Sequence, residues 1–516
     1  MQEETLVTIH NRRYLDLYRA ALSGRLSRRD VLRRATALGL SMPAVAALLA
    51  ACGGGGGGGD EATATMSGGT GTTPTTAATP AESPAASPTT APSASPSGSP
   101  TGGATYTLET PPEVFNADAA SQYSGQTITY YGDTVGIGGE LDQQLARAFT
   151  EATGININIV PKPQSSTENY ATYLRLFQAQ SPDMDVMMID VIWPGAFAQH
   201  LLDLTDAFRE EAALHYETII QNNTVDGVLV AMPWFADFGM LYYRTDLLEK
   251  YGFSNPPETW DELEEMAQAI VEGEQASNPN FGGFVFQGNA YEGLTCNALE
   301  WLASTGGGTL MDEEGNVTID NPEAIAMLNR VRGWIGTICP RGVTSYQEED
   351  SRNVFQGGNA AFLRNWPYVY ALATGEDSPI AGNVGVAPLP AAEGFDHVGT
   401  VGGWQLAVSR YSQVPEAAIE FVRYMTSPQV QSYRAQVGSF VPTIPSVAEE
   451  AAVLEKMPFL EPMQDVVRVT RPSTQTGERY NQVSTAFFQG VNAILNGQDA
   501  EQVVPQTAQQ MQRAAG

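Results

Sequence analysis

Short apolar runs alternate with helical patterns between residues 127 and 190, and no other feature of the sequence restricts the fold as much. "TITYYGD" (127–133) has the composition of a strand, and "ELDQQLARAFTEATG" after it repeats its apolar side chains at helical spacing, with Gly154 as its stop. "ININIV" (155–160) alternates with the period of a strand, and "YATYLRLFQAQ" is again helical before the buried run "MDVMMID" (184–190). Strands that alternate with helices predict a parallel, doubly wound sheet, and hence an α/β fold.

The segment that follows predicts a change of lobe. "VLVAMPWFADFGMLYYR" (228–244) has the pattern of two short strands interrupted at its Pro-Trp-Phe run (233–235). Long helical patterns come next, and Thr259 with Glu262 forms the capping box of "TWDELEEMAQAI". We therefore expect the chain to pass into a second lobe near Phe235.

Two positions in these patterns are candidates for ligand contact. Asp190 ends a strand, and ligands of open α/β sheets bind beyond the carboxyl ends of the strands. The alternative for Asp190 is an acid that caps the next turn. In "FLRNWPYVYAL" (362–372), Pro367 fits the first position of a helix and would leave Trp366 outside it, with the ring on a rigid support. The alternative for Trp366 is a ring buried under the helix start.

The N-terminus has the pattern of an export signal. Arg28 and Arg29 form a twin-arginine motif, and the apolar stretch 35–51 after them is too short and too polar to span a membrane. "LAAC" resembles a lipobox, so Cys52 is predicted to be lipidated and to become the mature N-terminus, with residues 1–51 as the signal peptide. A single acylated anchor would hold the protein at a membrane surface without spanning it. The alternative is an ordinary leader that contains a cysteine.

Composition separates a tether from a folded body. Residues 52–120 are predicted to be flexible, because Gly, Thr, Ala, Ser and Pro cannot bury enough surface to offset the entropy lost on ordering. The remaining chain is long enough for two domains. The formal charge is −31, and the first 51 residues carry eight Arg and four acids, so the exported chain has a charge of about −35. This charge argues against nucleic acid and anionic lipid as partners.

The usual signatures of an enzyme are missing from the sequence. No histidine beyond the leader is spaced with cysteines or acids as in a metal site, and there is no G-x-S-x-G elbow, Walker loop or dinucleotide fingerprint. We therefore predict no catalytic residue, no metal and no cofactor. Cys296 and Cys339 belong to an exported chain, where a disulfide is permitted. A disulfide between them and two buried free thiols both remain open.

Several of these motifs together resemble one family. The lipidated leader, the tether, "PWFADFGMLYYRTDLLEKYGF" and "GNAAFLRNWPY" are similar to extracellular solute-binding proteins of family 1, the sugar receptors of ABC importers. The likeness runs from about Ile128 to the C-terminus. "NWPYVYAL", "GGWQLAVSRYS" and "VTRP" resemble most closely the trehalose/maltose-binding branch.

The resemblance implies a two-lobed α/β fold of the periplasmic-binding-protein type. Each lobe would be a doubly wound sheet flanked by helices, and the chain would cross the hinge three times, near Phe235, Ala387 and Pro428. The lobes would close around the ligand as a population shift toward the closed state. The expected limits are residues 121–235 and 388–428 for the first lobe, and residues 236–387 and 429–516 for the second.

The resemblance also implies a set of ligand-binding residues. A sugar has apolar C–H faces and a rim of hydroxyls, so it suits flat aromatic rings together with charged hydrogen-bonding groups. Phe235 stands where related sequences carry a tyrosine, and its ring therefore lacks that hydroxyl. Carried over residue by residue, the expected site consists of Glu140, Asp190, Phe235, Asp237, Trp366, Tyr368, Gly403, Trp404 and Arg471.

The expected function is that of a non-catalytic, monomeric receptor, anchored by lipid outside the cell membrane. It would bind a trehalose- or maltose-like disaccharide, or a small oligosaccharide, and deliver it to the transmembrane subunits of an ABC permease. One alternative is a receptor for another carbohydrate or a polyol. The alternative from the enzyme class is a lipid-anchored glycoside hydrolase, for which Asp190 and Asp237 would supply the two carboxyls.

Overall fold

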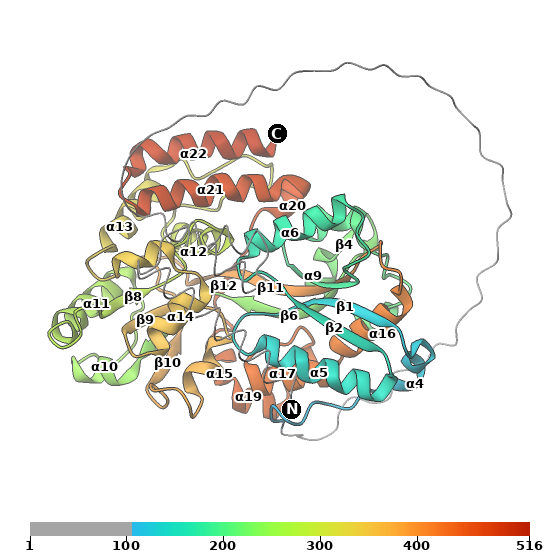
Figure 1. Ribbon diagram of the computed structural model, residues 1–516. Coiled ribbons are helices and arrows are strands. Elements are labelled where there is room, and N and C mark those ends of the chain that lie inside the picture. Colours follow the sequence, from blue (N-terminus) through green and yellow to red (C-terminus); the bar gives the residue numbers. More distant parts are fainter. Residues whose placement is uncertain (1–105) are drawn as a thin grey trace, which may run out of the picture. The chain divides into compact units, whose positions relative to one another are not determined.

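The structure is a computed structural model that describes residues 106–516, all of which belong to one compact unit (Figure 1). The twin-arginine residues Arg28 and Arg29 and the lipidation candidate Cys52 lie outside the described residues. None of the helices between residues 106 and 516 combines the length and the apolar character that crossing a membrane requires.

One mixed sheet and the helices packed on it form what we call the first lobe. The strands of this sheet are β1 (Thr127–Gly132), β2 (Asn156–Pro161), β3 (Val186–Asp190), β6 (Met232–Phe238), β11 (Val398–Val408) and β12 (Val467–Val469). Their order is β12-β11-β3-β1-β2, and β6 also pairs with β11. β1 runs parallel to β2 and β3, as the alternation predicts, whereas β11 runs antiparallel to β3 and β6.

Helices cover both faces of this sheet, and β3 is therefore buried along its whole length. These helices are α5 (Gly138–Thr153), α6 (Ser166–Gln178) and α16 (Pro415–Met425). Val186 and Met188 of β3 belong to the same core cluster as the apolar faces of α5 and α16. Met187 and Ile189 belong to the cluster that contains the aromatic side chains of α6. α5 ends at the predicted stop, Gly154, whose φ of 73° favours glycine.

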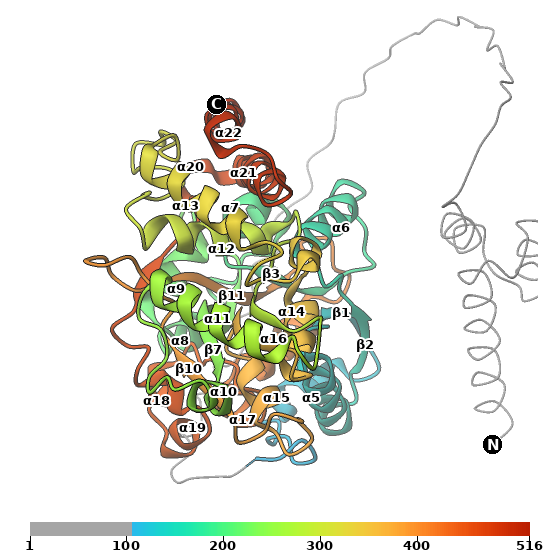
Figure 2. The same cartoon turned by 90° about the vertical axis from the view of Figure 1, so that its left-hand side faces the viewer.

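A sheet of four strands is the centre of the second lobe. Its strands are β7 (Met240–Arg244), β8 (Gly282–Val285), β9 (Ala360–Asn365) and β10 (Val384–Ala387), in the order β10-β7-β9-β8. The long helices of this lobe are α11 (Trp260–Glu274), α12 (Glu292–Ala303), α13 (Pro322–Trp334), α14 (Glu348–Gln356), α21 (Tyr480–Leu495) and α22 (Ala500–Ala515). The predicted capping box of Thr259 and Glu262 begins α11. α21 and α22 pack side by side near the C-terminus (Figure 2).

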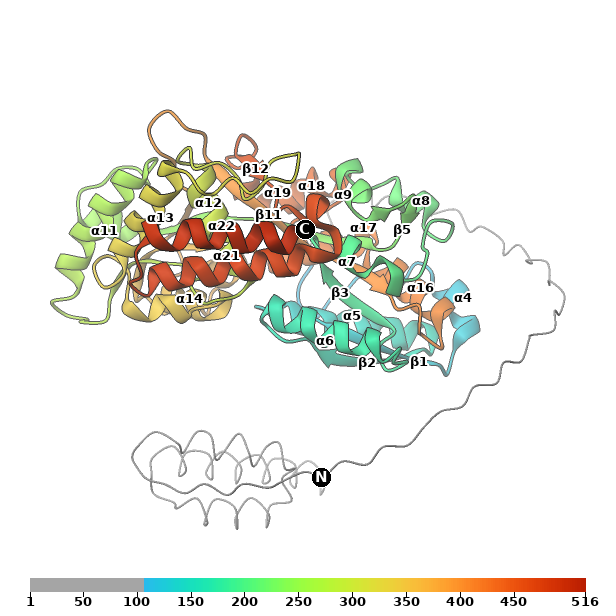
Figure 3. The ribbon, with the colours of Figure 1, turned by 90° about the horizontal axis from the view of Figure 1, so that it is seen from above.

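Short elements connect these parts. They are α4 (Ala117–Ala120), α7 (Pro194–Phe197), α8 (Arg209–Ala212), α9 (Glu217–Asn222), β4 (Thr224–Val225), β5 (Val228–Leu229), α10 (Thr245–Lys250), α15 (Val369–Thr374), α17 (Pro428–Gly438), α18 (Pro445–Ala448), α19 (Ala451–Lys456) and α20 (Ser473–Thr476). Seen from above, the helices α11 and α13 of the second lobe lie on one side, and β1, β2 and α5 of the first lobe on the other (Figure 3). The predicted two-lobed α/β fold is thus confirmed.

β6 runs without interruption through Pro233, so the predicted break before Phe235 is wrong. Proline is tolerated because β6 pairs with a single strand, β11, and the ladder shifts register beside Gln405, the partner of Pro233. The chain leaves the first sheet at Gly239 and continues as β7 in the second sheet. A Cβ atom at Gly239 would meet the Glu300 carboxylate and the Arg364 guanidinium, so a larger residue here would displace this buried ion pair.

α17 follows the third expected hinge crossing, yet it contacts the first lobe. Its residue Arg434 donates a hydrogen bond to Asp142 of α5, with 3.0 Å between Nη1 and Oδ1. One contact does not locate the hinge, so the limits of the lobes expected from the sequence, including the one at Pro428, stay predictions.

Residues 106–120 contact the first lobe, although the sequence places them in the flexible tether. The Tyr106 ring packs edge-on against Tyr433 of α17, with 5.6 Å between the ring centroids. The backbone oxygens of Leu108 and Pro112 accept hydrogen bonds from tyrosine hydroxyls of α17 and α16. The tether prediction is wrong for this segment, because its few apolar side chains find a complementary surface on the lobe, which composition cannot reveal.

A buried histidine ties the loop before α9 to the segment after α17. His215 lies within 2.9 Å of the Thr443 hydroxyl, measured from Nδ1 to Oγ1, and is only 6 % exposed. Burial lowers the pKa of His215 to about 3, because an imidazolium would lose its hydration there.

We expect the free energy of unfolding to decrease as the pH falls from about 6.5 toward 3, because the unfolded chain takes up a proton on His215 that the folded chain excludes. The slope is about 1.4 kcal/mol per pH unit for one proton. His215→Gln should remove this part of the slope in urea denaturation at pH 7, 5.5 and 4. Thr443→Val, which keeps the histidine, should retain it, and an unchanged slope in His215→Gln would refute the assignment.

Candidate functional site

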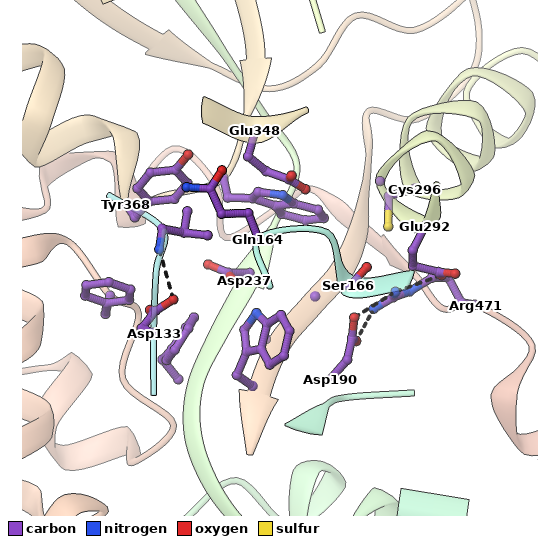
Figure 4. Close-up of a pocket in the computed structure, with 18 residues that line it drawn as sticks. Asp133, Gln164, Ser166, Asp190, Asp237, Glu292, Cys296, Glu348, Tyr368 and Arg471 are labelled. Atoms are coloured by element: carbon purple, nitrogen blue, oxygen red, sulfur yellow. Dashed lines mark hydrogen bonds and ion pairs between the residues drawn. The ribbon is translucent and has the colours of Figure 1, made fainter. Parts of the chain in front are cut away.

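A cavity with an empty volume of about 630 Å³, part of it open to solvent, lies between elements of the two lobes (Figure 4). Eight of the nine expected ligand-binding residues line it: Asp190, Phe235, Asp237, Trp366, Tyr368, Gly403, Trp404 and Arg471. The residues that sequence reasoning did not identify are Asp133, Val135, Gln164, Ser166, Glu292, Gly293, Cys296, Glu348, Gly402 and Phe440.

Trp366 follows the last residue of β9 and lines the cavity with a half-buried ring. The guanidinium carbon of Arg364 lies 4.0 Å from the centroid of this ring, and the Tyr242 hydroxyl donates to the Trp366 backbone oxygen over 2.8 Å. The prediction that Pro367 is the first residue of a helix is wrong. Pro367 lies in a turn closed by the Tyr370 N–H, and α15 begins two residues later. The support of the ring is therefore the end of a buried strand.

Trp404 comes from β11 of the first sheet, whereas Trp366 comes from the second. Its ring meets Trp193 edge-on at 5.7 Å and lies under the Lys162 ammonium, which is 4.3 Å from the ring centroid. The adjacent Gly403 has a φ of 117° and approaches the Phe235 backbone so closely that a Cβ would lie 2.6 Å from its oxygen. A glycine at 403 is therefore required for β11 to carry Trp404 past β6 in this geometry.

Asp237 of β6 lines the middle of the cavity, and its carboxylate accepts no hydrogen bond from any residue between 106 and 516 (Figure 4). Burial raises the pKa of this carboxyl well above its usual range, and the nearby carboxylates of Asp133 and Asp190 add to the rise. The positive charges of Arg364 and Arg434, which do not line the cavity, lower the pKa of Asp237 and offset part of this rise. Asp237 is thus an acceptor that has no protein donor, which a ligand hydroxyl would supply.

Arg471 lies at one end of the cavity and bridges two carboxylates (Figure 4). Its Nη2 donates to Asp190 Oδ1 over 2.8 Å, and its Nη1 donates to Glu292 Oε1 over 3.0 Å. Glu292 is held in turn by the hydroxyls of Tyr480 and Ser484. Burial raises the pKa of the Glu292 carboxyl, and the Arg471 charge counteracts this. The two expected residues Asp190 and Arg471 therefore form an ion pair, and Arg471 also links β3 of the first lobe to Glu292 of α12 in the second.

Glu140 is exposed in the first turn of α5 and does not line the cavity. Asp133, at the end of β1, contributes a carboxylate from the same loop. Its Oδ1 accepts the backbone N–H groups of Thr134 and Val135 over 2.8 and 3.2 Å and lies 3.5 Å from the Lys162 ammonium. Asp133 could have been identified from the sequence, because it lies at the carboxyl end of a strand. The same argument identified Asp190.

Cys296 and Cys339 are both free and buried, so the possible disulfide is not formed. Cys339 belongs to the apolar core of the second lobe, while Cys296 lines the cavity beside Glu292. Burial raises the pKa of the Cys296 thiol to about 12. Of the two alternatives left open by the sequence, two free thiols is the one found.

Glu292 and Glu348 were missed because each is the first residue of its helix, α12 and α14. An acid in the first turn of a helix has a sufficient local reason, namely its favourable interaction with the helix dipole. Their place at the cavity follows from packing of distant segments, and no periodicity in the sequence indicates it.

The cavity combines aromatic rings from both lobes with carboxylates and one guanidinium. This set of groups suits a neutral ligand with apolar faces and many hydroxyls. Among the residues that the structure describes, no group of His, Cys, Asp and Glu is arranged to hold a metal ion.

Comparisons with known proteins agree on one family. The family model described as bacterial extracellular solute-binding protein matches residues 131–432. A protein of Deinococcus radiodurans, named as a probable ABC transporter-binding protein, is 49% identical over 385 residues, which are 74% of this chain and 92% of that protein.

Solved structures give the same result. Maltose-bound MalE3 of T. maritima is 39% identical and superposes with a TM-score of 0.70, covering 75% of this chain and 99% of its own. The GacH receptor of Streptomyces glaucescens, solved unliganded and with acarbose, is 24% identical with a TM-score of 0.66 and covers 75% of this chain and 98% of its own. At that identity, the likeness to GacH supports the fold alone.

Proposed function

Because this chain belongs to the family of bacterial extracellular solute-binding proteins, we propose that its cavity binds a disaccharide of the trehalose or maltose type. The chain is the substrate-binding component of an ABC transporter for sugars. The family and the solved relatives are binding proteins and not enzymes, which argues against the glycoside hydrolase alternative.

One observation carries the proposal: two tryptophan rings, one from each lobe, line a cavity that also contains the unpaired carboxylate of Asp237. Trp366 and Trp404 supply flat apolar surfaces for the C–H faces of sugar rings, and Asp237 accepts hydrogen bonds from hydroxyls. The 39% identical MalE3 was solved with maltose, which supports this class of sugar.

The proposal includes a route to the membrane. Lobe closure over the sugar presents the closed form to the transmembrane subunits of an ABC permease, and the receptor acts as a monomer outside the cell membrane. Export by the twin-arginine motif at Arg28 and Arg29 and lipidation of Cys52 would keep the receptor near that permease.

Calorimetric titration of the purified chain with trehalose, maltose, sucrose, glucose, maltotriose and mannitol tests the proposal. We expect saturable binding of one disaccharide that is tighter than that of glucose, because a second ring fills the cavity between the two tryptophans. Tightest binding of mannitol would indicate the polyol alternative. Binding of none of these solutes would refute the proposal of a sugar ligand.

A further inference from the structure

The two ends of the cavity differ in chemistry. One end contains the ion pair of Arg471 with Asp190 and Glu292 (Figure 4). The other end, which we call the apolar end, is lined by Val135, Phe235, Tyr368 and Phe440.

Phe235, Tyr368 and Phe440 belong to one core cluster, and Val135 packs against it. The rings of Phe235 and Phe440 meet edge-on with centroids 4.8 Å apart. The Tyr368 ring lies against Gly136, the neighbour of Val135, so closely that a Cβ at residue 136 would be 2.6 Å from it. Arg434, which does not line the cavity, lies near both pairs of residues. Its guanidinium carbon is 4.1 Å from the centroid of the Phe440 ring, and its Nη2 is 4.0 Å from Oδ2 of Asp133, two residues before Val135.

Several polar groups around the apolar end already have protein partners. The Tyr368 hydroxyl donates to Glu349 over 2.7 Å, and the Gln164 amide donates to the backbone oxygen of Thr134 over 3.3 Å. Asp133 accepts two backbone N–H groups and pairs with Lys162. A ligand hydroxyl placed against the rings of Phe235 and Phe440 would give up its hydrogen bonds to water and meet aromatic carbon, which is unfavourable.

We propose that the apolar end selects a glycoside that carries an apolar group there, such as the methyl group of a 6-deoxy sugar or an aryl aglycone, in place of a hydroxyl-bearing group. The inference rests on the proposed function, because it refines which sugar the same cavity prefers. An apolar wall rejects an added hydroxyl only moderately, by up to about a hundredfold. We therefore expect a preference of about ten- to a hundredfold, and not an absolute requirement.

Calorimetry on the full chain tests this with matched ligands. Maltose is compared with 6′-deoxymaltose and with 4-nitrophenyl α-maltoside, and trehalose is compared with 6-deoxytrehalose. The deoxy sugars place a methyl group on a ring, whereas the nitrophenyl maltoside places an aromatic aglycone at the reducing end, so the arms separate the two sources of an apolar group. We expect at least one of these ligands to bind about tenfold tighter than its parent or better.

Two variants locate the preference. Phe235→Tyr and Val135→Thr each add a hydroxyl to the apolar end, and either should reduce the preference to severalfold or less. Phe395→Tyr makes the same chemical change as Phe235→Tyr on a side chain that is 49 % exposed and outside the cavity, and should leave the preference unchanged.

The outcomes distinguish this inference from the proposed function. If a parent sugar binds but no apolar analogue binds more tightly, the inference fails and the proposed function stands. If the preference exists but persists in both Phe235→Tyr and Val135→Thr, its assignment to the apolar end is overturned. If no parent and no analogue binds, the proposed function fails and the inference fails with it.

Discussion

Trp366→Ala is expected to weaken sugar binding by about a hundredfold. Truncation of a central aromatic side chain at a binding site typically costs 2 kcal/mol or more, and about 1.4 kcal/mol corresponds to tenfold in affinity. The loss should be large here because the ring is already fixed before the ligand arrives. Arg364 lies 4.0 Å beneath it, and Tyr242 holds the backbone at the same residue. Little entropy is then lost when the sugar stacks on it.

Calorimetric titration of the wild type, Trp366→Ala and Trp366→Phe with the best disaccharide measures this effect. Trp366→Phe retains a flat ring and should bind more tightly than Trp366→Ala. All three proteins should unfold at similar urea concentrations, because the Trp366 side chain is half-buried at the cavity. Equal affinities of Trp366→Ala and the wild type would show that the sugar does not stack on this residue.

Glu300→Ala is expected to destabilise the fold by about 3–5 kcal/mol, because it leaves a buried guanidinium without its counter-charge. Glu300 and Arg364 form a two-pronged ion pair whose side chains are each 1 % exposed. Glu300 also accepts the Thr400 backbone N–H over 3.0 Å, and Arg364 donates to Gln287 over 3.0 Å. This pair holds β9 to α12 and β11 under the Trp366 ring, so its loss should also weaken sugar binding.

Urea denaturation of Glu300→Ala measures the change in the free energy of unfolding. The matched control is Asp206→Ala, which breaks the ion pair of Asp206 with Arg209, whose side chains are 89 % and 75 % exposed. An exposed pair contributes about 1 kcal/mol or less, so this control should unfold almost as the wild type does. A loss below 1 kcal/mol in Glu300→Ala would contradict the role assigned to the buried pair.

The elements of the first lobe could be predicted because their sequence patterns are local. The alternation of "ININIV" and the stop at Gly154 depend on neighbouring residues alone, and both appear in the structure as predicted. β6 was predicted to break at Pro233 because a proline cannot donate to a strand ladder. Which side of a strand remains unpaired is decided by sheet topology, and a single strand's sequence does not contain it.

The aromatic residues and the central acids of the site were expected through the resemblance to a family. Glu140 was carried over from the same resemblance, but the helix that contains it turns its side chain to solvent, and Asp133 lines the cavity instead. Glu292 could not be predicted as a residue of the site from the sequence. It meets Arg471, which is 179 positions away in the chain and follows β12, through the packing of α12 against β11 and β12. No pattern within either segment indicates that contact.

A crystal structure of the protein grown with maltose or trehalose is the most direct test of sugar binding in this cavity. We predict electron density for a disaccharide whose ring faces contact Trp366 and Trp404, with at least one hydroxyl in hydrogen-bond distance of the Asp237 carboxylate. A sugar bound elsewhere, or a cavity that stays without sugar at saturating concentration in solution, would contradict the assignment.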